Sequence, residues 1–146
     1  MIMRNNLADC YWDADKLEQA IPLYKRTLAD QAQVLGADHP DTLITQNNLG
    51  EAYRNAGRLG EAIELFESAL AVAAVTESAD HPDIFNYRNS LATAYLENGQ
   101  TREGISLLQS TLTDAEQVFG DDHPITALVR RNLTVAHSGG LPDVSP

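Results

Sequence analysis

The sequence predicts an all-α protein, a solenoid of helix-turn-helix repeats with about three and a half units and seven helices. The prediction rests on a fixed period, because landmark residues recur at one interval and no insertion interrupts the register. Such self-similarity is the sequence signature of a solenoid, in which each unit buries its apolar face against its neighbour. The landmarks 42 positions apart are Leu7, Leu49, Leu91 and Leu133 (49 − 7, 91 − 49, 133 − 91), and His39, His81 and His123 (81 − 39, 123 − 81).

The stretch over residues 38–69 shows what is repeated. Its apolar residues follow helical spacing in two runs, one before and one after residues 55–58. Gly57 lies in that break, where the end of a helix favours a left-handed residue. Pro40 suits the first turn of a helix, and Asp38 or His39 is the expected N-cap. Each unit is therefore a first helix (helix A), a tight turn and a longer second helix (helix B).

The elements follow in order along the chain. Helices are expected over about 3–13 and 16–35, in a unit over about 40–76, in a unit over about 82–119, and over about 124–137. We therefore assign a solenoid to residues 1–137, with units at about 1–35, 36–77 and 78–119 and a final helix at 120–137. Residues 138–146 are expected to form a flexible tail.

The motifs resemble the tetratricopeptide repeat family, and within it the long-period subclass found in kinesin light chains. The family pattern is L-G-x-x-Y in helix A and A-x-x-x-F in helix B. Leu49-Gly50-x-x-Tyr53 and Ala62-x-x-x-Phe66 match it. The resemblance implies a right-handed superhelix whose helices A line a concave groove that binds a peptide or protein segment. The family tryptophan is absent, and its place is taken by Arg4, Gln46, Arg88 and Arg130.

Composition narrows the class of partner. The formal net charge is −11, from 21 acidic and 10 basic residues. This balance disfavours nucleic acid and anionic membrane surfaces, because phosphate binding needs clustered Lys and Arg. No run approaches the ~18 apolar residues that a membrane span needs. The charge balance leaves a protein or peptide as the expected partner. The single cysteine, Cys10, and the lack of an apolar signal segment predict a cytoplasmic protein.

The candidate site is a set of helix-A residues that the resemblance places along the groove. Asparagine pairs recur there, although asparagine inside a helix is mildly unfavourable. An asparagine side chain offers both a donor and an acceptor, so a row of them can bond the backbone of an extended peptide. The alternative is that these asparagines bond one another, or a neighbouring helix, and hold the repeats together. The candidates are Asn5, Asn6, Asp9, Ile44, Asn47, Asn48, Glu51, Arg54, Asn55, Asn89, Arg131 and Asn132.

Catalytic and metal-binding patterns are not evident in the sequence. The three in-phase histidines are expected to begin helices, because repeats place them too far apart to share a metal ion. We expect no enzyme activity, cofactor or metal. A second hypothesis is a structural spacer, or a self-associating segment, of a larger regulator of the bacterial signalling type. Apolar residues of the last helix, such as Leu128 and Val129, predict weak self-association through the solenoid ends.

Overall fold

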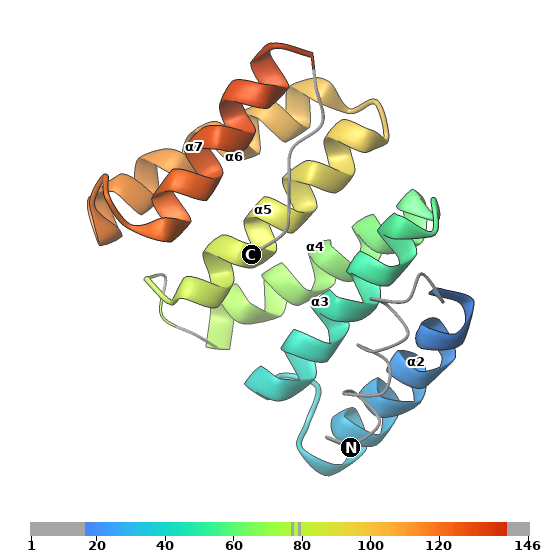
Figure 1. The fold of residues 1–146 in the computed structure, drawn as a ribbon. Coiled ribbons are helices and arrows are strands. Elements are labelled where there is room, and N and C mark those ends of the chain that lie inside the picture. The colour runs from blue at the N-terminus through green and yellow to red at the C-terminus, as the bar shows by residue number, and fades with distance from the viewer. Residues whose placement is uncertain (1–16, 77, 79, 140–146) are drawn as a thin grey trace. The chain divides into compact units, whose positions relative to one another are not determined.

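The computed structural model describes residues 17–76, 78 and 80–139, and within these ranges it contains six α-helices and no strand. The fold is the expected all-α solenoid class of helix-turn-helix repeats (Figure 1). The helix predicted over residues 3–13 lies outside the described residues. The helices are α2 (Leu17–Val34), α3 (Pro40–Asn55), α4 (Leu59–Thr76), α5 (Pro82–Glu97), α6 (Thr101–Phe119) and α7 (Pro124–His137). They form two compact units, unit 1 over Met1–Thr76 and unit 2 over Glu77–Pro146.

In unit 1, α3 packs against both α2 and α4 (Figure 1). Most of the apolar residues predicted to face inward are buried, and Phe66 of α4 is fully buried, whereas Leu59 and Leu70 are only half-buried. Burying a side chain of this size contributes about 1.5–3 kcal/mol of transfer free energy. The buried apolar residues of unit 1 are Ala20, Ile21, Tyr24, Leu43, Leu49, Ala52, Tyr53, Ala62, Ile63, Phe66, Ala69 and Ala73.

In unit 2, α6 packs against α5 and α7, and α5 also contacts α7. The core that joins the three helices contains Ala92, Leu96, Leu108, Val129 and Ala136. Partly buried residues, among them Ile125 and Leu133 of α7, pack against this cluster. Within the described residues, no helix is both long and apolar enough to cross a membrane.

Local chemistry sets the helix boundaries. The imidazole Nδ1 of His39, His81 and His123 each accepts the backbone N–H two residues on, at 3.1, 3.2 and 3.1 Å. The prediction that these histidines begin helices is therefore confirmed, and His39 rather than Asp38 is the N-cap of α3. Gly57 has φ +80°, and the N–H of Arg58 bonds the carbonyl of Tyr53 at 2.8 Å, the pattern of a Schellman cap. The predicted A–B turn is confirmed.

Candidate functional site

The predicted residues of unit 1 follow one side of α3. Ile44, Asn48, Glu51 and Asn55 are separated by four, three and four positions (48 − 44, 51 − 48, 55 − 51), so their side chains share one helical face. All four are half-buried or exposed, and Ile44 is 39% exposed. With the flanking Asn47 and Arg54 they form a surface that we call the α3 face. It combines one apolar side chain, amides and an ion pair.

The charges of the α3 face belong to a close pair. Arg54 Nε donates to Glu51 Oε2 at 3.0 Å, and a terminal guanidinium nitrogen lies 2.9 Å from the same oxygen. The two side chains are only 9% and 15% exposed. Asn55 Nδ2 donates to the backbone carbonyl of Glu51 at 2.9 Å. The pair is therefore fixed in place, and the polar end of the α3 face is pre-organised.

Two asparagines of the α3 face keep unused hydrogen-bonding capacity. Asn48 is half-buried and makes no hydrogen bond to any described residue. Asn47 Oδ1 and Glu51 Oε1 are buried acceptors that find no donor in the part of the chain that the structure describes. A buried acceptor without a donor costs about 1–3 kcal/mol. The α3 face thus holds polar groups that one further donor would stabilise.

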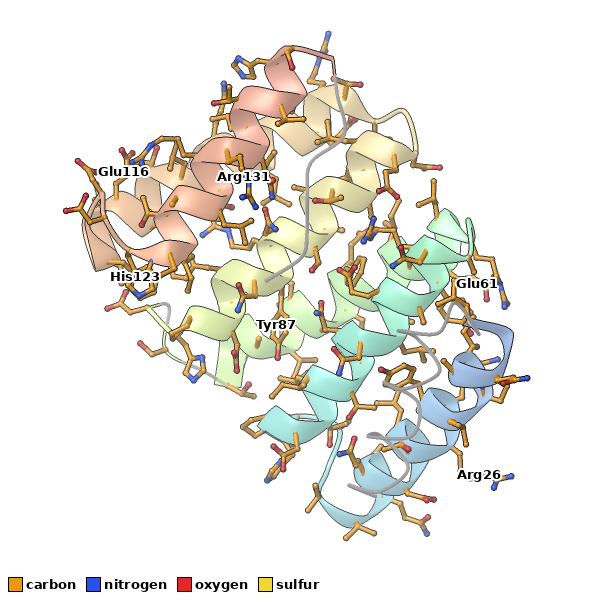
Figure 2. All side chains as sticks on the ribbon, in the orientation of Figure 1. Arg26, Glu61, Tyr87, Glu116, His123 and Arg131 are labelled. Atoms are coloured by element: carbon orange, nitrogen blue, oxygen red, sulfur yellow. The ribbon has the colours of Figure 1, made fainter. Side chains whose placement is uncertain are left out.

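The asparagines of unit 2 are arranged differently. Asn132 Nδ2 of α7 donates to Asn89 Oδ1 of α5 at 2.9 Å, and the two residues are 0% and 4% exposed. This is the arrangement that the alternative hypothesis describes, in which asparagines on different helices bond one another. Arg131, the neighbour of Asn132, is exposed on α7 (Figure 2). The remaining candidates, Asn5, Asn6 and Asp9, lie outside the described residues.

The side chains that replace the family tryptophan bond neighbouring helices, which the sequence did not predict. In α5, the guanidinium of Arg88 donates to Asp114 Oδ2 and to Ser110 Oγ of α6, each at 2.9 Å. In α7, Arg130 lies 3.4 Å from a carboxylate oxygen of Glu116. In α3, Gln46 Nε2 donates to the carbonyl of Leu65 of α4 at 3.0 Å. The recurrence of long polar side chains at this position was the available signal.

The histidines at the helix starts have partners within the fold. In the described ranges, no three His, Cys, Asp or Glu side chains gather as metal ligands would. His123, at the start of α7 (Figure 2), stacks on Phe119 with ring centres 4.4 Å apart. Its Nδ1 is occupied by the helix cap. The arrangement can therefore bind and position other groups through hydrogen bonds, apolar contact and charge.

Comparison with known proteins finds one family and several similar solved structures. The family model of the tetratricopeptide repeat matches residues 1–74, 46–112 and 83–140. Two crystal structures of nearly identical TPR-like repeats, assigned to a kinesin light chain of Podosopora anserina, superpose with a TM-score of 0.85 at 30% identity. The alignment covers 94% of this chain and 65% of theirs.

A third structure, BtubC (BKLC) from P. vanneervenii, superposes with a TM-score of 0.77 at 24% identity. The alignment covers 90% of this chain and 52% of that one, and at this identity it supports the fold alone. The chain therefore spans less than two thirds of the length of these solved structures. No curated protein sequence matches the chain.

Proposed function

The chain belongs to the tetratricopeptide repeat family, and from this premise we propose that it is a non-catalytic protein-interaction module. Repeats of this family are in general scaffolds for protein–protein interaction. The finer proposal is that the α3 face binds an extended peptide or protein segment. The candidates on other A helices, and the cytoplasmic location, stay predictions.

The half-buried Asn48 is the observation that carries this proposal. Its amide lies inside a helix, where asparagine is mildly unfavourable, and it bonds no described residue. A peptide backbone offers a carbonyl and an N–H at once, which is what an asparagine amide complements. Ile44 and the Glu51–Arg54 pair lie one turn away on either side and would contact the side chains of the same segment.

The charge of the chain favours neutral or basic segments. The formal net charge is −11, so a basic segment is attracted before it makes contact. Such long-range attraction accelerates association and weakens as salt is added. The Glu51–Arg54 pair neutralises itself locally, so the preference comes from the whole surface rather than from one residue.

Selection from a displayed library of random peptides tests the proposal. Asn48→Ala should weaken binding of the selected peptides by about 0.5–1.5 kcal/mol, the net value of one hydrogen bond, and by a similar amount for different sequences. The matched control is Gln109→Ala, which removes an exposed amide from α6 and is not one of the residues of the α3 face. Equal affinity for the wild type and Asn48→Ala would contradict the proposal, as would the recovery of no peptide at all.

The second candidate function is a structural spacer or self-associating segment of a larger regulator. The part-buried apolar residues of α7, such as Ile125 and Leu133, favour it because they are partly exposed. Leu128 is also part-buried, but Val129 is fully buried, so the expectation that Val129 contributes to self-association is wrong. Light scattering over a concentration series distinguishes the two functions. A mass that rises with concentration, together with a library that yields no peptide, supports the second candidate. A constant monomer mass with peptide binding supports the first.

A further inference from the structure

A hollow of about 450 Å³ lies in unit 1, above α3 and between α2 and α4. Gln46 and Leu49 of α3 form part of its floor, and Glu64, Leu65 and Ser68 of α4 form one wall. We call it the α2–α4 hollow. On a helix that turns 100° per residue, positions 46, 49 and 53 lie opposite positions 44, 48, 51 and 55. The hollow is thus separate from the α3 face, and nothing in the proposed function uses it.

The repeat itself shows which side chain this position accommodates. Gln46 occupies the position of Arg88 in the next repeat (88 − 46 = 42), and Ser68 that of Ser110 (110 − 68 = 42). In unit 2 the Arg88 side chain is 15% exposed and its guanidinium bonds Ser110 and Asp114 at 2.9 Å. In unit 1 the shorter Gln46 bonds the carbonyl of Leu65 instead. Ser68 therefore lines open space where its counterpart holds a guanidinium.

The charges around the hollow leave one carboxylate available. Glu61 is bonded by two nitrogens of Arg58, both at 2.7 Å, and these hydrogen bonds raise the pKa of Arg58 above its ordinary value. Glu64 is exposed and pairs with no base among the described residues. Lys25 of α2 is the one base among the residues that line the hollow, and it lies on the opposite wall. The α4 wall is thus the side that attracts a cation.

We propose that the α2–α4 hollow binds an arginine side chain presented by a partner protein. The aliphatic part of the arginine packs on Leu49 and Leu65, which are apolar lining residues. The guanidinium reaches Ser68, the counterpart of Ser110. The carboxylate is supplied by Glu64, one turn before Ser68, because Val72 stands at the position of Asp114. A planar fork of donors suits a hydroxyl and a carboxylate one turn apart better than a lysine ammonium does.

A titration of the full chain with a capped glycine peptide that carries one arginine tests the proposal. The measurement is the movement of backbone amide resonances in NMR spectra. Saturable shifts are expected at Glu64, Ser68 and Gln46. The matched probe is the same peptide with citrulline, which keeps the shape and removes the charge. It should bind about two- to fivefold more weakly, the ratio that a solvent-exposed ion pair gives.

Variants that copy unit 2 provide the control. Gln46→Arg with Val72→Asp recreates the Arg88–Asp114 pair (114 − 72 = 42), so it should fill the hollow from within and abolish the shifts. Glu64→Gln should leave the fold intact and reduce the arginine peptide to the affinity of the citrulline peptide. Asn48→Ala should leave these shifts unchanged, which separates this site from the α3 face. Absence of a saturable shift, or full binding by the filled variant or by Glu64→Gln, would overturn the proposal.

Discussion

Unit 1 and unit 2 place different side chains at the same A–B contact. In unit 1, Gly50 of α3 faces Phe66 of α4, and a Cβ on Gly50 would lie 2.5 Å from Cε1 of the ring. In unit 2, the matching residues are Ala92 and Leu108, both fully buried. The larger ring therefore requires the residue without a Cβ, and the smaller leucine leaves room for a methyl group. Volume is conserved across the contact rather than at either position, as close packing requires.

A second A–B contact also differs between the units, and here the glycine lies on helix B. In unit 2, a Cβ on Gly104 would lie 2.6 Å from Cγ of Leu96 and 3.0 Å from the carbonyl oxygen of Ala92. In unit 1, the residue at the position of Leu96 is Arg54, which bonds Glu51, and Ala62 replaces the glycine. In each unit the glycine lies opposite a large side chain: Gly50 on helix A faces Phe66, and Gly104 on helix B faces Leu96. The two units share a backbone design while their side chains are fitted separately.

The largest effect is expected from Gly50→Ala. The new methyl group would meet three atoms of the Phe66 ring at 2.5–3.0 Å, and that ring is fully buried, so it cannot move aside. The unfolding free energy should fall by up to about 3 kcal/mol, the upper range for overpacking a core. Urea denaturation measures it. The control is Gly60→Ala in α4, where a Cβ meets nothing within 4 Å. It should stabilise the protein by about 0.5–1 kcal/mol.

The same contact permits a rescue. Gly50→Ala with Phe66→Leu copies the Ala92 and Leu108 of unit 2, so the double variant should be more stable than the sum of its single changes predicts. Residues in contact show coupling of about 0.5–3 kcal/mol. Strict additivity of the two changes would mean that the compensation between the units is coincidental.

The next effect concerns the asparagines, which also differ between the units. Asn132→Ala removes a fully buried amide and leaves Asn89 without its partner, so we expect a loss of about 2 kcal/mol in unfolding free energy. Asn48 of unit 1 occupies the same repeat position as Asn132, two periods earlier (132 − 48 = 84). Asn48→Ala should change stability little, because Asn48 bonds no described residue. Thermal melts of both variants measure this. A large loss of stability in Asn48→Ala would show that Asn48 has the structural role that Asn132 has in unit 2.

The sequence alone predicted the helices well and the side-chain partners poorly. The bounds of α3 to α7 depend on local features, the histidine caps, Pro40 and the glycine turns, and all of these are visible within a few residues. The bond between Asn89 and Asn132 depends on which positions of two helices meet, and the repeat places the same residue types in both units. The α2–α4 hollow is lined by residues of three helices, among them Gln46. The absent tryptophan and its replacements were visible in the sequence, but the partners of Gln46 and Arg88 required coordinates.

A smaller effect tests a feature that the units share. Gly57 and Gly99 have φ +80° and +82°, and a Cβ at either would meet nothing within 4 Å. Gly57→Val and Gly99→Val should therefore each cost about 1–2 kcal/mol, all of it from placing a β-branched residue in the left-handed region. Chemical denaturation of the two variants should give equal losses. Gly57→Asn should cost less than Gly57→Val, because asparagine adopts this conformation more readily. Unequal losses of unfolding free energy at the two turns would show that the surroundings of Gly57 and Gly99 differ.

The smallest effect is expected where the units differ at the surface. Arg88→Gln gives unit 2 the residue of unit 1 and removes the bonds to Asp114 and Ser110. The Asp114 side chain is 50% exposed, so water screens the pair and the loss should be only about 0.2–1 kcal/mol. Half-molar salt should shrink the difference between the wild type and the variant further, because the Debye length falls to a few ångströms, about 3–8 Å.

Arg88→Lys is the matched control. It keeps the charge but loses the two-armed geometry, so its stability should lie between those of the wild type and Arg88→Gln. A loss in Arg88→Gln that exceeds this range and resists salt would mean that the contact of Arg88 with Phe85, whose ring centre lies 5.7 Å from the guanidinium carbon, carries the stability. In that case Gln46 marks a true packing deficit in unit 1, and Gln46→Arg should raise its melting temperature.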